Sequence, residues 1–233
     1  MYTVEYLKAN SNLPGPRGNL ELLYKYAGQA NEESISECLK EICPDTTNSP
    51  EEFVGMCGIV GYAVLNRDNP KEAIGAIRKF ASHQSWRIRE AVAIGIQEMA
   101  EGRISEIQNL LSCWVEGNQF EQRAVVAALC EPKLLPDDET AERTLEVLAL
   151  IIHDFKVSGK LEEGDRVLRK ALGYGFSVAI VGAPEKGMKL FEAFLKVARD
   201  NKHIQWILKE NLKKNRLVRM NEPWTDRMKE LIN

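Results

Sequence analysis

Two stretches of the chain match each other at an offset of 34 residues. Residues 86–94 read Trp-Arg-Ile-Arg-Glu-Ala-Val-Ala-Ile, and residues 120–128 read Phe-Glu-Gln-Arg-Ala-Val-Val-Ala-Ala. An aromatic residue opens both stretches, and Arg89 aligns with Arg123. Looser echoes follow at 166–172 and 203–208. A period of this length is typical of helix pairs, which bury their apolar faces only by stacking on neighbouring pairs.

Proline, glycine and capping residues divide the chain into helices. Pro50 and Pro70 each follow a polar residue and precede acidic ones, a pattern that begins helices. Residues 12–19 hold two prolines and two glycines and are predicted to form a loop, as are residues 44–50. The segment 173–181 is rich in β-formers but alternates poorly, so it is expected to be the end of a helix or a short helix of its own. Helices are expected from residue 20, and over 34–42, 50–66, 70–82, 184–199 and 202–216, with a short one from residue 223.

The sequence therefore predicts one all-α domain over residues 1–233. Residues 50–217 would carry the repeats. Residues 1–45 would form an N-terminal cap or a separate arm, and residues 218–233 a tail or short helix. Hydrophobic residues make up 44% of the chain, which is enough for a sizeable core.

The apolar stretches are too short for a membrane span. The longest, such as 145–152, fall well below the roughly 20 residues that cross a bilayer. The N-terminus shows no secretory pattern, so a cytoplasmic location is expected. The five cysteines are odd in number and lack C-x-x-C spacing, which favours buried thiols over disulfides. Cys38, Cys43 and Cys57 have no histidine near them in the sequence, which favours buried thiols over metal ligands, so no metal or other cofactor is expected.

Charge is segregated along the chain. Residues 163–233 carry 15 basic and 9 acidic side chains, whereas residues 86–162 carry 8 and 14. Lys202, Lys209, Lys213 and Arg216 recur at helical spacing and are predicted to share one face. Such a row, with Trp206 and Lys214 beside it, suits phosphates along a duplex. The alternative is a solvated outer helix without a ligand.

Two blocks resemble the bacterial DNA alkylation repair family of AlkC/AlkD-type glycosylases. They are His-Gln-Ser-Trp-Arg-Ile-Arg-Glu-Ala-Val-Ala at 83–93 and the tryptophan-bearing basic stretch at 204–217. The resemblance implies a right-handed α-solenoid, an α-α superhelix of HEAT-like repeats. It also implies a basic concave face that grips double-stranded DNA, and an activity that removes alkylated purines.

Trp86, Arg87, Arg89 and Arg123 are the further candidates for nucleic-acid contact. A tryptophan can stack on sugars or bases, and a guanidinium can clamp a phosphate with two hydrogen bonds. The alternative is a packed tryptophan with arginines that bond adjacent repeats. The leading hypothesis is thus a HEAT-like protein that binds a macromolecule, either double-stranded DNA or a protein.

An alkylpurine DNA glycosylase is the alternative function. Such an enzyme needs a carboxylate near the sugar. Glu90 and Asp154 are the candidates for this role, and the alternative for each is a solvated or salt-bridged helix residue. The one Trp-x-Asp pairing, Trp224 with Asp226, lies near the end of the chain.

Overall fold

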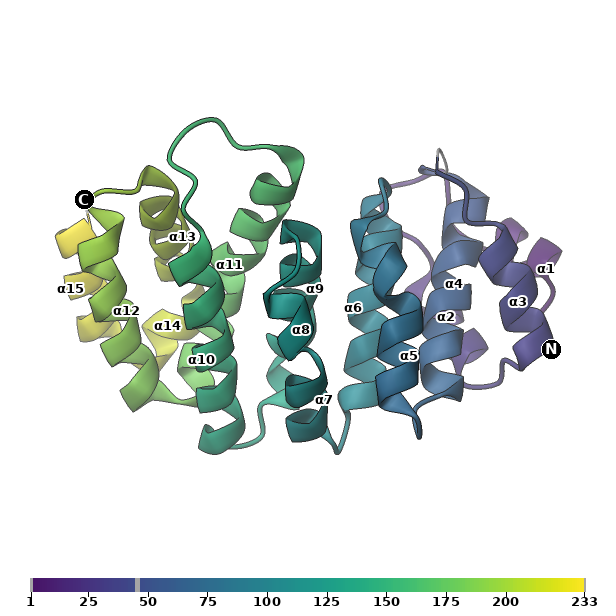
Figure 1. Cartoon of the computed structure of the whole chain (residues 1–233), viewed down its shortest axis with the longest axis horizontal. Helices are drawn as coiled ribbons and strands as arrows, with labels where there is room; N and C mark the ends of the chain where they lie inside the picture. The colour runs from purple at the N-terminus through teal and green to yellow at the C-terminus, as the bar shows by residue number, and fades with distance from the viewer. Residues whose placement is uncertain (1, 45–46, 233) are drawn as a thin grey trace. The chain divides into compact units, whose positions relative to one another are not determined.

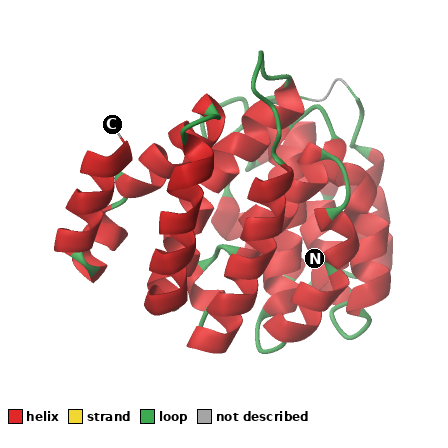
Figure 2. Ribbon diagram, turned by 60° about the vertical axis from the view of Figure 1, so that its left-hand side comes forward, coloured by secondary structure: helices red, strands yellow, loops and turns green. Residues whose placement is uncertain are grey.

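The chain is helical throughout the part that the structure describes. The computed structural model describes residues 2–44 and 47–232, and these contain α-helices and two short 3-10 helices but no strand (Figures 1 and 2). The predicted all-α class is confirmed. The predicted loop at 44–50 includes residues 45 and 46, which lie outside the described residues. The helices form two compact units, residues 1–110 and residues 111–233.

The first unit is built around one helix, α4 (Pro50–Leu65), which is buried along almost its whole length. Helix α6 packs along α4, and α5 lies beside both (Figure 1). The other elements of this unit are α1 (Val4–Ala9), α2 (Leu20–Ala27), α3 (Glu32–Lys40), α5 (Pro70–Ile77), η1 (Arg78–Ser82), α6 (Trp86–Ala100) and α7 (Ile104–Leu110).

Small residues let α3 approach α4 closely. A Cβ atom added to Gly58 would lie 3.0 Å from Cβ of Cys38 and 3.0 Å from the backbone nitrogen of Leu39. A side chain at this position would therefore push the two helices apart. Helices α1, α2 and α3 all pack against α4. The N-terminal residues thus belong to the first unit and do not form a separate arm.

The second unit is built around α11 (Glu163–Gly182), which packs against α9, α10, α12, α13 and α14. Segment 173–181 is the second half of this helix, so the first of the two sequence alternatives is correct. The other elements are α8 (Ser112–Val115), α9 (Gln119–Leu129), η2 (Pro132–Leu134), α10 (Asp138–Asp154), α12 (Pro184–Ala198), α13 (Lys202–Leu212), α14 (Asn215–Met220) and α15 (Glu222–Ile232).

The helix predicted over 202–216 is in fact two helices. Helix α13 ends at Leu212, and Lys214 adopts an extended backbone with φ −81° and ψ 121° before α14 begins. The break turns the chain so that Leu217 of α14 is fully buried, and α14 packs on α11. Spacing within a helix does not reveal this turn, because Leu212 and Leu217 both look like ordinary core positions.

Candidate nucleic-acid interface

The start of α6 holds three of the predicted contact residues. Ser85 caps this helix, since its hydroxyl accepts hydrogen bonds from the backbone N–H groups of Arg87 and Ile88. Trp86 is 53% exposed and so is not a core tryptophan. The guanidinium carbon of Arg87 lies 4.6 Å from the centroid of the Trp86 ring, within cation–π range.

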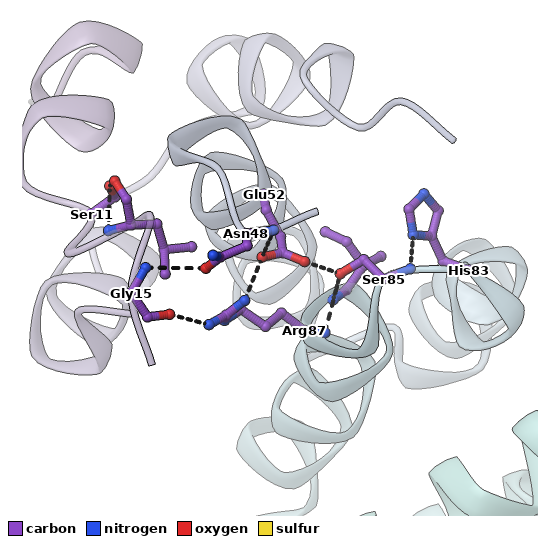
Figure 3. Close-up of polar contacts among 9 residues, drawn as sticks. Ser11, Gly15, Asn48, Glu52, His83, Ser85 and Arg87 are labelled. Carbon is purple, nitrogen blue, oxygen red and sulfur yellow. Dashed lines mark hydrogen bonds and ion pairs between the residues drawn. The ribbon is translucent and has the colours of Figure 1, made fainter. Parts of the chain in front are cut away.

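Arg87 itself points into the first unit and bonds with Glu52 of α4. Its Nη1 lies 2.8 Å from Oε2 of Glu52, and the two residues are 5% and 1% exposed. Figure 3 shows the two side chains pointing toward each other. Ser85 donates a short hydrogen bond to the other oxygen of the same carboxylate. Glu52 therefore accepts from both an arginine and a serine in a site closed to solvent.

The surrounding loops are tied to the same pair (Figure 3). Nη2 of Arg87 donates to the carbonyl oxygen of Gly15 at 2.6 Å, and the backbone N–H of Asn48 donates to Glu52 at 2.9 Å. The backbone N–H of Gly15 in turn donates to Oδ1 of Asn48 at 3.1 Å. Residues from the first loop, α4 and α6 thus meet at one buried ion pair, which is an arrangement that holds structure together.

Arg89 is also committed to internal bonds. Its Nη1 donates to the carbonyl oxygens of His83 and Gln84, at 2.6 and 2.8 Å. Nδ1 of His83 accepts from the backbone N–H of Ser85 at 3.0 Å. The geometry favours the structural alternative for both arginines, because a phosphate would have to displace these bonds. Trp86 is the exposed member of the three.

The remaining seven predicted residues lie in the second unit. Arg123 is half-buried on α9. On α13, Lys202, Trp206 and Lys209 follow one another at helical spacing on the more exposed face, and Lys213 is the C-cap residue. The opposite face of α13 is buried and consists of His203, Ile204, Ile207, Leu208, Asn211 and Leu212.

The cations of this region differ in their partners. Lys213, the C-cap residue of α13, forms an ion pair with Glu210 of that helix. Lys202, Lys209, Lys214 and Arg216 form no ion pair with any carboxylate of the described residues. We call these four residues the basic row. Their charges are not neutralised within the described part of the protein, so they remain available to an anion.

Trp206 lies on the more exposed face of α13, yet its ring packs against Arg169 of the second unit. The guanidinium carbon of Arg169, on α11, lies 4.2 Å from the centroid of its ring. Nη1 of Arg169 lies 3.0 Å from Nδ1 of His203, and Nε2 of His203 lies 2.9 Å from the carbonyl oxygen of Gly159. Since arginine only donates, Nδ1 of His203 accepts and its proton sits on Nε2. Burial lowers the pKa of Arg169 from its ordinary value.

Sequence reasoning missed Glu52 and Arg169. Glu52 resembles any acidic residue of a first helical turn, and Arg169 resembles any cation of a polar face. The only local sign was the capping serine before Trp86, which marks where the N-terminus of α6 lies. The partners of both residues are brought close by tertiary packing alone.

The two acids that the sequence offers for catalysis, Glu90 and Asp154, lie in different units. Glu90 is half-buried on α6, and Asp154 is exposed beside His153, with 3.1 Å between Oδ1 and Nδ1. Glu52, the most buried acid, is saturated with donors. No group of three or more potential metal ligands occurs among residues 2–44 and 47–232. Over the same residues, no helix has the length and apolarity to span a bilayer.

No family model, curated protein or solved structure matches this chain. Its structural class therefore rests on the described residues alone. It is an all-helical protein of about 15 helices.

Proposed function

We propose that this chain binds a macromolecule, and that the basic row of α13 and α14 contacts the phosphate backbone of duplex DNA. One observation carries the proposal: four cations of one short segment have no carboxylate partner among the described residues. At about 1.5 Å of rise per residue, Lys202 and Lys209 are about 10 Å apart along α13. Phosphates follow each other at about 3.4 Å along one strand of the duplex axis, so this length spans several of them.

The contact would be electrostatic rather than base-specific. Three of the four members of the basic row are lysines, which offer a point charge and no planar fork for reading a base edge. Trp206 is not an open stacking platform, because Arg169 covers its ring. Phosphate contacts of this kind set affinity and its salt dependence but carry no sequence information. Binding to unrelated duplexes of equal length should therefore be similar.

The proposal includes stacking of the helix pairs into a right-handed HEAT-like superhelix. Support comes from pairs of residues about one repeat apart. In the second unit, Arg169 contacts His203, and the backbone N–H of Ser177 donates to Asn211, both at a separation of 34. In the first unit, Glu52 bonds with Ser85 and Arg87, at separations of 33 and 35. Helices one period apart thus lie side by side within each unit, as the proposed architecture requires.

The test is fluorescence anisotropy with a labelled duplex over a range of salt concentrations. We expect weak binding that falls steeply as salt rises, with a slope of about −0.9 for each phosphate contacted. Replacing three members of the basic row, Lys202→Ala, Lys209→Ala and Arg216→Ala, should reduce the size of that slope by about 2 to 3.

A matched control removes three cations that are ion-paired in the same unit. Arg143→Ala, Lys186→Ala and Lys229→Ala change the net charge equally. They should alter the slope much less. Equal losses in the two triple variants would show a general charge effect and remove the assignment to the basic row.

A separate assay tests the repair reaction that the resemblance implies. Release of 7-methylguanine or 3-methyladenine from alkylated DNA would assign that reaction to the chain. Binding without release would leave it a binding protein.

A further inference from the structure

A groove runs along the seam between α12 and α15 in the second unit. Two depressions of about 520 and 700 Å³ lie along it. They are lined on one side by residues of α12 and its C-cap, from Glu185 to Arg199, and on the other by Asn221 and residues of α15, from Pro223 to Leu231. Because the two depressions share lining residues, they form one continuous groove.

Glu192 lies in the middle of the groove, where it lines both depressions. Its Oε1 accepts from Nε1 of Trp224 at 2.9 Å and from Nη2 of Arg227 at 2.6 Å. The negative charge of Glu192 is therefore paired within the groove. The two bonds also link α12 to α15, which gives the groove a fixed width at this point.

Apolar side chains line both depressions, with Leu195, Met228 and Leu231 in the first and Met188, Pro223 and Trp224 in the second. Met228 is fully buried, and Leu195 is partly exposed. Leu231 is 64% exposed, the largest value among the big apolar side chains of the described residues. Apolar lining along a groove suits the apolar face of a bound helix.

The charge along the groove is positive. Lys189, Lys196 and Arg199 are exposed, and none forms an ion pair with a carboxylate of the described residues. With Glu192 neutralised by Arg227, Glu185 is the one acid left among the lining residues. An occupant must therefore bring both apolar side chains and negative charge.

We propose that this groove docks an acidic amphipathic helix of a protein partner. The 15 residues of α12 extend for about 22 Å, which matches about four turns of a bound helix. Apolar residues at i, i+3, i+4 and i+7 of that helix fill the two depressions. Its carboxylates pair with Lys196 and Arg199. This site is separate from the basic row and does not rest on DNA binding.

The test uses two synthetic peptides of about 16 residues, the length of four helical turns. The first carries leucine at i, i+3, i+4 and i+7 and glutamate on its flanks. The second has lysine in place of every glutamate. Fluorescence anisotropy at low salt should show that the acidic peptide binds at least about tenfold more tightly than the basic one.

Charge reversal in the groove should change this preference. Lys196→Glu with Arg199→Glu should weaken the acidic peptide by about tenfold or more and favour the basic peptide. The control reverses two exposed cations of the same unit outside the groove, Lys160→Glu and Lys170→Glu. It should leave both affinities nearly unchanged. All four positions are exposed, so circular dichroism should show intact helices in both variants.

Hydrogen exchange locates the contact. The acidic peptide should slow exchange over 184–198 and 222–232, and a Leu231→Ser variant should weaken its binding. Three outcomes overturn the proposal. They are equal or absent binding of the two peptides, displacement of the acidic peptide by duplex DNA, and a dimer of the chain alone that Leu231→Arg converts to monomer. The last outcome would assign the groove to a second copy of this chain.

Discussion

Nη1 of Arg87 lies 2.8 Å from Oε2 of Glu52, and both side chains are withdrawn from solvent. This pair joins the N-terminal turns of α4 and α6 and binds the carbonyl oxygen of Gly15 in the first loop. The guanidinium of Arg87 also lies against the ring of the exposed Trp86. Arg87, which the sequence predicts to contact nucleic acid, thus links three segments of the first unit.

Removing one member of this pair should strongly destabilise the first unit. Glu52→Ala leaves the Arg87 guanidinium buried without its counter-charge, which costs about 3–5 kcal/mol in comparable sites. Urea unfolding followed by circular dichroism measures the loss. The double variant Glu52→Leu with Arg87→Met should lose less than the sum of the single variants, because no unpaired charge is buried.

The exposed pair Lys25–Glu21 provides the control for this prediction. Its atoms are 2.6 Å apart, but both side chains are open to solvent. Replacing both residues by alanine should leave the unfolding curve almost unchanged. A similar loss for both pairs would show that burial is not what makes the Glu52–Arg87 pair important.

Asn211→Leu should destabilise the second unit. The amide of Asn211 is fully buried and inserts between α11 and α13. Its Oδ1 accepts from the backbone N–H of Ser177 at 2.7 Å, and its Nδ2 donates to the carbonyl oxygen of Leu172 at 2.8 Å. Leucine removes both of these hydrogen bonds, at a cost of about 0.5–1.5 kcal/mol each.

The amide of Ser177 reports this change directly. Its hydrogen exchange should be faster in Asn211→Leu than in the parent chain, as NMR would show. Lys170→Ala, an exposed substitution on the same helix, should not alter it. Unchanged exchange at Ser177 in both variants would mean that the Asn211 amide does not support α11.

The five thiols should react with a disulfide reagent in two classes. Cys43 and Cys113 are exposed, whereas Cys38, Cys57 and Cys130 are buried. Burial raises the pKa of each buried thiol, so little thiolate is present at mildly alkaline pH. We expect two fast equivalents in the native protein and five after denaturation. Five equivalents at one rate without denaturant would contradict the described packing.

Asp137 should make α10 sensitive to acid. Its carboxylate accepts from the backbone N–H of Thr140 at 2.8 Å at the start of this helix, and this bond lowers the pKa of Asp137. A lowered pKa contributes stability that is present above the unfolded value, near 3.9, and is lost as pH falls through the folded value.

The comparison of the parent chain with Asp137→Ala tests this directly. The melting temperature of the variant should be lower at pH 7, and the gap should close as the pH falls below about 4. Asp137→Asn retains an acceptor for the Thr140 N–H, so it should restore part of the stability without the pH dependence. A gap that stays constant down to pH 2 would mean that ionisation of Asp137 does not stabilise α10.

Much of the helix pattern was predictable from the chain alone. Pro50 and Pro70 do begin α4 and α5, and α2 does begin at Leu20, because helix starts depend on adjacent residues. The shared face of Lys202 and Lys209 was also readable, since it follows from the helical period, but Lys213 and Arg216, predicted on the same face, lie past the end of α13. The break between α13 and α14 was not, because it serves the burial of Leu217 against another part of the unit.

The sequence by itself determined the helical class, most helix positions and the segregation of charge. Tertiary structure alone decided which charges are available. Arg87 is adjacent to the exposed Trp86, yet it is buried because Glu52 and Gly15 reach it from elsewhere in the chain. Local patterns depend on neighbours a few residues apart, whereas the partner of a charge is whichever group packing brings within a few ångströms.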